Sequence, residues 1–389
     1  MKKYLLSSLS LVVVAACGSS GDIADSGTDA STDDQSAADA PLGDAMPGVP
    51  ITGTTPGTWN WVDFPTALCR DGTPTGIGIS PSTTGSKKLM IFLEGGGACF
   101  NAQVCGTNPS HFGKAELTSV FIPAEGTKGI FSRTDTNNAV ADWNMVYVPY
   151  CTGDVHAGNA PNATVPGVPG TQQFVGYTNM TQYLSRIVPT FPDMQRVLLT
   201  GQSAGGFGAA LNYVQTARSF GSVPVDLLDD AGPLMANPYL ASCLETSMSN
   251  LWGLSKTVIG QDCGTDCTDV GNSLAQYWTH IPKTYPNARF GFIDSTGDSV
   301  ISTFFGFGAS NCTGFQSVSA AQYEAGLLDM RTAVAADSNA GLFIYAGTDH
   351  TTVVSTYTTR SAPGGDGGTI KFEDWVSSLV TDSVSNVGP

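Results

Sequence analysis

Short apolar runs recur along the chain, separated by polar or glycine-rich segments. Each run is continuous rather than alternating, which predicts strands that are covered on both faces. The runs occupy residues 89–93, 145–148, 197–199, 223–228, 290–293 and 342–345.

Apolar residues at helical spacing lie between most of these runs. The spacing predicts helices over residues 180–188, 207–214, 323–334 and 372–379. Strands that alternate with helices predict an α/β protein with a mainly parallel, doubly wound sheet. We find no internal repeat, and residues 49–389 are therefore expected to form one domain.

The first residues have the pattern of an export signal. Lys2 and Lys3 precede an apolar segment, residues 5–16, that is too short to span a bilayer permanently. The segment ends in Val-Ala-Ala-Cys, which resembles a bacterial lipobox, so we expect residues 1–16 to be removed and Cys17 to receive lipid. The lipid would anchor the exported protein to a membrane, the outer membrane in a Gram-negative cell. The alternative is an ordinary signal peptide and a secreted protein.

Residues 17–48 are predicted to form a disordered acidic tether. They contain seven Asp, no Lys or Arg, and too few large apolar residues to offset the entropy of ordering. Without signal and tether, 15 basic and 26 acidic residues remain, so the domain itself carries a charge of −11. This acidity, with no basic cluster beyond Lys2 and Lys3, argues against a nucleic-acid partner.

Eight cysteines remain when Cys17 is set aside, and an even number in an exported chain predicts four disulfides. The sequence does not select a pairing, although Cys99 with Cys105 would close a short loop. A metal site that recruits His280 is the less favoured alternative, because the Cys-x3-Cys spacing has no matching second pair. The disulfide candidates are Cys69, Cys99, Cys105, Cys151, Cys243, Cys263, Cys267 and Cys312.

Residues 197–207 carry the clearest chemical signal: an apolar run leads directly into Gly-Gln-Ser-Ala-Gly and then into a helical pattern. A Gly-x-Ser-x-Gly sequence between a strand and a helix predicts a sharp turn that projects the serine hydroxyl. Glycines two residues before and after the serine prevent clashes with neighbouring elements. Ser203 is therefore the predicted nucleophile.

A serine nucleophile needs a base, and in this context an acid and then a histidine follow the serine along the chain. Of the four histidines, His350 alone lies in a loop after a late apolar run, so it is the predicted base. The loop after the fifth run contains Asp294 and Asp298; Asp298 is preferred as the acid and Asp294 is second. Asp229 and Asp230 could serve in a variant arrangement, but lining the site or capping a helix is the favoured interpretation.

Backbone N–H groups must bind the oxyanion that forms during acyl transfer. The residue after the nucleophile, Ala204, is one expected donor. The others should come from a glycine-rich loop after an early strand, and Glu-Gly-Gly-Gly-Ala-Cys follows the first run as required. Gly96 and Gly97 are assigned as donors, whereas the preceding Glu94 is interpreted as a buried brace.

Taken together, these residues resemble the pectin acetylesterase and Notum family of carboxylesterases. The resemblance covers most of the chain from residue 49 to about residue 350. Its segments are Cys-Arg-Asp-Gly-Thr-Pro at 69–74, Phe-Leu-Glu-Gly-Gly-Gly-Ala-Cys-Phe-Asn at 92–101 with Cys105 following, Trp-Asn-Met-Val-Tyr-Val-Pro-Tyr-Cys at 143–151, and residues 201–212. The resemblance implies an α/β-hydrolase fold, a triad of Ser203, Asp298 and His350, oxyanion donors at Gly96, Gly97 and Ala204, and no metal or organic cofactor.

The family implies the reaction more sharply than the substrate. Its members include enzymes that remove acetyl groups from pectin and one that removes a long unsaturated acyl group from a signalling protein. Plant members usually have Trp where this chain has Ala98, a position expected to shape the acyl pocket. Asp154 and His156 either line that pocket or lie in a surface loop.

The expected function is hydrolysis of carboxylic esters, with O-acetyl groups on pectin or a related polysaccharide as the first substrate candidate. A lipase or polyester-type esterase is the alternative within enzymes. A catalytically silent, glycan-binding surface lipoprotein is the alternative from another class.

Overall fold

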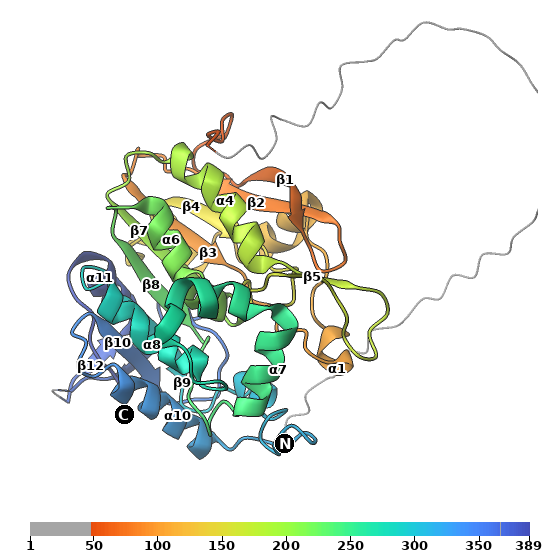
Figure 1. The fold of residues 1–389 in the computed structure, drawn as a ribbon. Coiled ribbons are helices and arrows are strands. Elements are labelled where there is room, and N and C mark those ends of the chain that lie inside the picture. Colours follow the sequence, from red (N-terminus) through yellow and green to blue (C-terminus); the bar gives the residue numbers. More distant parts are fainter. Residues whose placement is uncertain (1–47, 366) are drawn as a thin grey trace, which may run out of the picture. The chain divides into compact units, whose positions relative to one another are not determined.

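An eight-stranded sheet with the order β1-β2-β4-β3-β7-β8-β9-β10 organises the chain (Figure 1). The strands are β1 (Asn60–Leu68), β2 (Pro74–Ser80), β3 (Lys88–Leu93), β4 (Asn144–Val148), β7 (Arg196–Gln202), β8 (Val225–Asp230), β9 (Phe290–Ser295) and β10 (Ala340–Tyr345). The computed structural model describes residues 48–365 and 367–389, which fall within one unit that extends to Pro389. The predicted signal, Cys17 and the tether lie outside the described residues.

Strands β4, β3, β7, β8, β9 and β10 run parallel, whereas β1 and β2 are antiparallel to their neighbours. Each of the six predicted runs overlaps one of the parallel strands, which confirms the α/β class and the α/β-hydrolase fold. The longer helices are α4 (Gly176–Thr190), α5 (Ala204–Leu211), α6 (Tyr213–Phe220), α7 (Ser242–Trp252), α8 (Ser273–Thr284), α10 (Ala320–Ala333) and α11 (Phe372–Thr381).

Shorter elements decorate this framework. Two hairpins, β5 with β6 and β11 with β12, pair antiparallel. The short elements are α1 (Ala102–Cys105), α2 (Lys114–Glu116), η1 (Leu117–Phe121), α3 (Ile122–Ala124), η2 (Gly129–Phe131), β5 (Ala160–Ala163), β6 (Gln172–Phe174), η3 (Leu254–Lys256), η4 (Val258–Cys263), η5 (Gly264–Asp266), α9 (Ile301–Phe305), β11 (Ser361–Pro363) and β12 (Thr369–Lys371). In the part of the chain that the structure covers, no helix is both long and apolar enough to cross a membrane.

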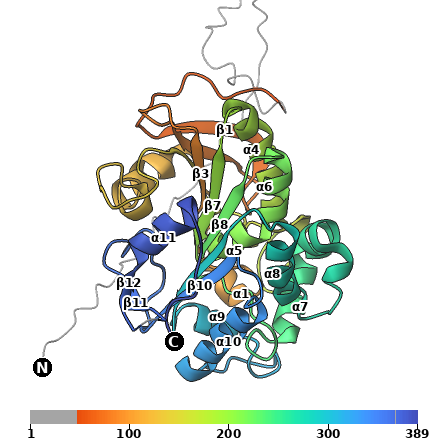
Figure 2. The ribbon, with the colours of Figure 1, turned by 90° about the vertical axis from the view of Figure 1, so that its left-hand side faces the viewer.

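The sheet separates two apolar cores. Leu89, Ile91 and Leu93 of β3 pack into the first core, whereas Met90 and Phe92 of the same strand pack into the second. Because successive side chains of a strand point to opposite faces, this division places one core on each side of the sheet. Figure 2 shows α4, α6 and α8 on one side and α11 on the other. Because both faces of the parallel strands are covered, the side chains on both faces are apolar, which explains why the runs are continuous.

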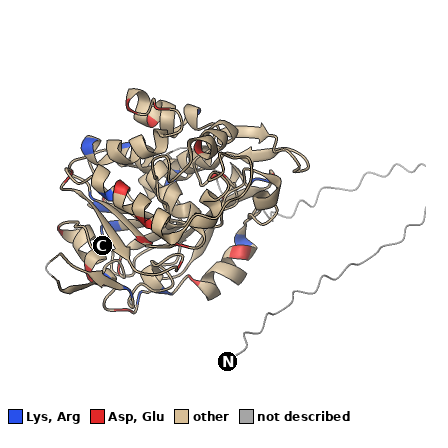
Figure 3. Cartoon of the chain, turned by 90° about the horizontal axis from the view of Figure 1, so that it is seen from below, with Lys and Arg blue, Asp and Glu red and all other residues tan. Residues whose placement is uncertain are grey.

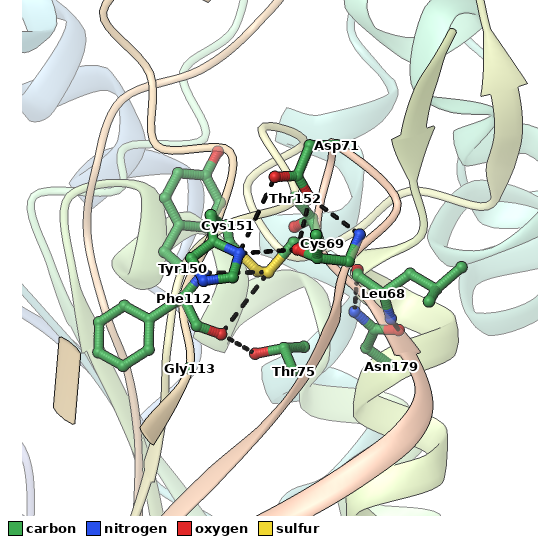
Figure 4. Close-up of a disulfide and its surroundings, with 12 residues drawn as sticks. Leu68, Cys69, Asp71, Thr75, Phe112, Gly113, Tyr150, Cys151, Thr152 and Asn179 are labelled. Atoms are coloured by element: carbon green, nitrogen blue, oxygen red, sulfur yellow. Dashed lines mark hydrogen bonds and ion pairs between the residues drawn. A yellow bond between two sulfur atoms is a disulfide. The ribbon is translucent and has the colours of Figure 1, made fainter. Parts of the chain in front are cut away.

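All eight candidate cysteines are paired, which confirms a disulfide-stapled fold. Cys69–Cys151 joins the turn between β1 and β2 to the segment after β4 (Figure 4). The backbone N–H of Phe112 donates to the Cys69 sulfur over 3.3 Å, so this bridge also anchors the segment after α1. The remaining pairs are Cys99–Cys105, Cys243–Cys312 and Cys263–Cys267. His280, the third member of the alternative metal site, instead contacts Asp266 at 2.9 Å.

Candidate active site

The predicted site residues follow different parallel strands, and all lie at the carboxyl ends of those strands. Ser203 comes directly after β7, Asp298 follows β9, His350 follows β10, and the glycine segment 95–97 follows β3. The carboxyl ends of parallel strands are where open α/β sheets bind ligands. The topology therefore gathers these side chains, although up to 255 positions separate them along the chain.

Ser203 occupies a tight turn with φ of 59° and ψ of −123°. A positive φ is uncommon for a residue other than glycine, and such strain concentrates at functional sites. The turn is close-packed: a Cβ on Gly201 would overlap the carbonyl oxygen of Gly205, and one on Gly205 would overlap that of Leu93. The backbone N–H of Ser203 donates to the Asp230 carbonyl over 2.7 Å, which fastens the turn to β8.

His350 is paired with Asp298. The His350 Nδ1 lies 2.6 Å from Asp298 Oδ2, and the other carboxylate oxygen accepts from the N–H groups of Val300 and Ile301 at 2.7 and 2.9 Å. The carboxyl of Asp298 is fully buried, while the imidazole is 17% exposed. Because a carboxylate accepts, Nδ1 carries the proton, and Nε2 is left as the basic nitrogen.

Asp294, the second choice for the acid, lies elsewhere. Its Oδ2 accepts from the Tyr323 hydroxyl over 2.6 Å and its Oδ1 from the Ser295 N–H over 2.7 Å. Burial and the nearby Asp298 carboxylate raise the pKa of Asp294 well above its usual value. The structure thus brings Asp298, and not Asp294, into contact with His350.

Asp230 connects the loops that carry Ser203 and His350. Its backbone carbonyl accepts from Ser203, and its Oδ2 accepts from the N–H groups of Thr352 and Val353 at 2.7 and 2.8 Å. Burial raises the pKa of Asp230 to about 6. From the sequence, Asp230 was expected to line the site or cap a helix, with the triad acid of a variant arrangement as the alternative. An acidic residue that ends a core strand beside the nucleophile's strand is the signal that could have indicated its role.

The glycine segment is held by its carbonyl groups. The Gly96 carbonyl accepts from the Asn108 amide over 2.8 Å, and the Gly97 carbonyl accepts from the Tyr150 hydroxyl over 2.7 Å. Among the described residues, the N–H groups of Gly96 and Gly97 donate to no recorded partner. Ala204 is the first residue of α5, so its N–H has no acceptor within the helix. Three free amides thus belong to the two segments that form the site.

Asp154 and His156 are both buried, and their side chains contact backbone groups near the site. Asp154 is fully buried, and its Oδ2 accepts from the N–H groups of Gly158 and Gly176. His156 Nε2 lies 2.9 Å from the Glu94 carbonyl oxygen, and burial lowers the pKa of His156 to about 4, so its imidazole is neutral at pH 7. Neither residue lines the neighbouring pocket; Val155 between them does.

An apolar pocket opens beside Ser203. It contains about 650 Å³ of space free of protein atoms, part of it open to solvent. Ala98 lies in its wall, at the position that the family resemblance marks as important for acyl size. Apart from Ser203 the wall is apolar: Gly97, Ala98, Phe100, Val155, Ala204, Phe207, Leu211, Leu240, Leu244, Met248, Trp252, Leu254, Leu274, Ile301, Phe304 and Phe305.

Comparison with known protein families gives a match over the first part of the domain. A family model described as pectinacetylesterase matches residues 60–280, which include Ser203 and the glycine segment. Asp298 and His350 lie beyond the matched range, so their pairing is an observation of the structure alone.

The chain also matches carboxylesterases of vertebrates. Palmitoleoyl-protein carboxylesterase notum2 of Xenopus laevis is 34% identical over 151 residues, 38% of this chain and 30% of the relative. Notum1 of the same species is 29% identical over 206 residues, 52% of this chain and 37% of the relative. The chain therefore spans about a third of the length of these relatives. A protein of Danio rerio named inactive palmitoleoyl-protein carboxylesterase notum1b is 35% identical over 105 residues, 26% of this chain and 73% of that relative.

Proposed function

Since the chain belongs to the pectinacetylesterase family, we propose that it is a serine carboxylesterase that hydrolyses acyl esters of alcohols. The observation that carries the proposal is the 2.6 Å contact between His350 Nδ1 and Asp298 Oδ2 at the sheet edge where Ser203 occupies its strained turn. This contact leaves the basic nitrogen of His350 available to take a proton from a nucleophile.

In the proposed reaction, the Ser203 hydroxyl attacks the acyl carbon while His350 Nε2 takes its proton. The amides of Gly96, Gly97 and Ala204 bind the oxyanion. When the tetrahedral intermediate collapses, the bond from the acyl carbon to the alcohol oxygen breaks, and His350 returns the proton to that oxygen. Water then attacks the acyl-enzyme with the same proton transfers, releasing a carboxylic acid and restoring Ser203. Chain, substrate and water supply every proton and electron pair, so the sequence of steps uses no cofactor.

Two classes of acyl group are candidates. O-acetyl groups on a polysaccharide such as pectin remain the first, in line with the family's description. The apolar pocket supports a second, an ester of a longer apolar acyl chain, because an acetyl group would leave most of that wall in contact with water. The vertebrate relatives are named as palmitoleoyl-protein carboxylesterases, which agrees with a long apolar acyl group.

A set of nitrophenyl esters from acetyl to decanoyl tests both the reaction and the acyl group. We expect turnover that Ser203→Ala abolishes, and covalent labelling of the native chain, but not of the variant, by a fluorophosphonate. A preference for octanoyl over acetyl would select the second candidate, and the reverse preference the first. Absence of labelling with a correctly folded chain would instead support a silent glycan-binding protein.

We also propose that the chain is exported and carries lipid on Cys17, as its N-terminal sequence predicts. Metabolic labelling with a fatty-acid analogue tests this. Label should enter the native protein and not Cys17→Ser, and equal labelling of the two would contradict the assignment.

A further inference from the structure

A second groove, more polar than the apolar pocket, lies beside the same site. It contains about 1140 Å³ of space, part of it open to solvent. Its walls come from residues 124–135 and 351–358, and Gln202 reaches it from the end of β7. Gln202 directly precedes Ser203, and Thr351 directly follows His350. The groove therefore adjoins the nucleophile and the base through their chain neighbours.

The groove and the apolar pocket belong to opposite faces of the sheet. Leu211 and Phe305 of the pocket pack in the first core, whereas Val354 and Tyr357 of the groove pack in the second. The Thr351 hydroxyl donates to Gln202 Oε1 over 3.4 Å. The site thus lies between an apolar pocket on one side of the sheet and a groove of mixed polar and apolar lining on the other.

The chemistry of ester cleavage assigns the two cavities different portions of the substrate. The acyl group must extend from the carbon that Ser203 attacks, and Ser203 and the expected oxyanion donors Gly97 and Ala204 line the apolar pocket. The leaving oxygen must face the imidazole that protonates it. Thr351, the residue that follows His350 in the chain, lines the groove. The alcohol portion should therefore leave toward the groove.

The lining of the groove indicates which alcohol it suits. Thr127, Ser132, Ser355 and Thr358 contribute hydroxyl groups that can both donate and accept hydrogen bonds. Two carboxylates and one ammonium group add a net negative charge, from Glu125, Asp135 and Lys128. Glu125 Oε2 accepts from Gln202 Nε2 over 3.4 Å, which places one of these carboxylates against the residue that precedes the nucleophile.

We propose that this groove is the alcohol subsite of the esterase and that it selects a neutral, hydroxyl-rich saccharide over one that carries carboxylates. The inference rests on the proposed esterase function and narrows its first substrate candidate: because pectin is a galacturonate polymer, the groove would favour esters of a related neutral polysaccharide over those of pectin itself. Hydroxyl groups match the lining, whereas a uronate carboxylate would meet Glu125 and Asp135 and be repelled.

The test compares three esters of one acyl group, the best of the nitrophenyl series: the nitrophenyl ester, a mono-ester of xylotriose and a mono-ester of trigalacturonate. At low ionic strength we expect kcat/KM for the xylotriose ester to exceed that for the trigalacturonate ester about tenfold, and the gap to narrow in high salt. Equal rates, a preference for the galacturonate ester, or no cleavage of either saccharide would overturn the proposal.

Two variants examine the groove itself. In the double variant Glu125→Gln with Asp135→Asn, Lys128 remains as the sole charge, so the preference for the neutral ester should shrink to about twofold or reverse. Thr358→Trp should fill the groove and lower the ratio of xylotriose-ester to nitrophenyl-ester kcat/KM about tenfold. Asp193→Asn is the matched control. Asp193 is exposed and lies just before β7, so it is at the amino-terminal end of this strand, opposite the end that carries the site. Its ratios should equal those of the native protein.

Failure of the subsite and failure of the esterase function give different results. If nitrophenyl-ester turnover is present and depends on Ser203, but Thr358→Trp leaves the ratio unchanged, the subsite assignment is wrong and the esterase stands. If Ser203→Ala turns over the nitrophenyl ester as fast as the native chain, the esterase function itself is wrong.

Discussion

Asp294 and Asp298 are four positions apart but have different surroundings. Asp298 accepts from two backbone amides and contacts His350, whereas Asp294 is bound by a tyrosine hydroxyl in the first core. Both carboxyls are buried, so the difference lies in their partners: a backbone amide and a tyrosine hydroxyl bind Asp294, whereas only Asp298 contacts an imidazole. The two side chains are therefore suited to different tasks despite their identical chemistry.

This contrast predicts the outcome of two matched substitutions. Asp298→Asn should lower kcat for a nitrophenyl ester by about 10³ to 10⁴, because an amide favours the wrong tautomer of His350. Asp294→Asn should stay within about threefold of the native rate, since an amide can still accept from Tyr323. The assay is steady-state hydrolysis with both variants checked for native circular dichroism. A large loss in Asp294→Asn with little in Asp298→Asn would reverse the assignment of the acid.

Asp230 makes the folded state sensitive to pH. Its pKa is raised from 3.8 to about 6 by burial, so between these values the unfolded chain loses a proton that the folded chain retains. The stability that this group contributes is complete below pH 3.8 and is lost as pH rises through about 6. The shift corresponds to roughly 3 kcal/mol.

Asp230→Asn removes this dependence and keeps an oxygen for the amides of Thr352 and Val353. We expect the unfolding free energy of the variant, relative to the native chain, to rise by up to about 3 kcal/mol between pH 4 and pH 7. Urea denaturation at several pH values measures the difference. A difference that is constant with pH would show that Asp230 titrates alike in both states.

At the scale of elements, the parallel strands could be predicted but the antiparallel ones could not. Residues 89–93 and 290–293 are continuous apolar runs, and they form β3 and β9. β2 has little side chain to recognise, because Gly76 and Gly78 occupy positions where a Cβ would meet neighbouring atoms. In β1 only Phe64 and Ala67 are buried, and the other residues are half-buried or exposed. Its pattern therefore resembles a surface segment.

One segment predicted to be a single helix forms two helices in the structure. The spacing over residues 207–214 predicts a single helix, but α5 ends at Leu211 and α6 begins at Tyr213. The Asn212 side chain between them donates to the His156 and Gly208 carbonyls. The spacing of apolar residues carries no information about such side-chain hydrogen bonds, so it could not predict the break between the two helices. The hairpin that β11 forms with β12 likewise lies outside the predicted strands.

A substitution in the segment after β3 tests whether acyl chains bind in the apolar pocket. Ala98→Trp should fill the apolar pocket, because the side chain at 98 lies in its wall. We expect kcat/KM for an octanoyl ester to fall at least about tenfold relative to the acetyl ester. Ala115→Trp on α2 is the control, since Ala115 is exposed and away from the pocket, and its chain-length profile should match the native one. An unchanged profile in Ala98→Trp would show that acyl chains bind elsewhere.

Across the whole molecule, stability rests on apolar cores and disulfides more than on ion pairs. Charged residues make up only 13% of the sequence, and Figure 3 shows them thinly spread over the described elements. Several of the described ion pairs, such as Lys87 with Asp193, are exposed and contribute little. The bridges are therefore the stronger constraint on the unfolded chain.

The bridges should differ in their contribution. Cys69–Cys151 has a sequence separation of 82 and Cys263–Cys267 one of 4. Loop-closure entropy predicts a loss of about 4.5 kcal/mol when the first pair is replaced by alanines and about 2 kcal/mol for the second. Urea unfolding under non-reducing conditions measures both. Equal losses would mean that packing around the sulfurs, rather than loop length, sets the effect.

The amino-acid sequence by itself determined the α/β class, the Gly-x-Ser-x-Gly turn with Ser203, the glycine segment and the expectation of four disulfides. These features are local patterns or counts, and a local pattern reports the backbone conformation that it favours. Which carboxylate meets His350, which cysteines pair, what Asp230 holds, and the two cavities were decided only by the tertiary structure. Each depends on the order of strands in the sheet, which brings together residues that no pattern along the chain connects.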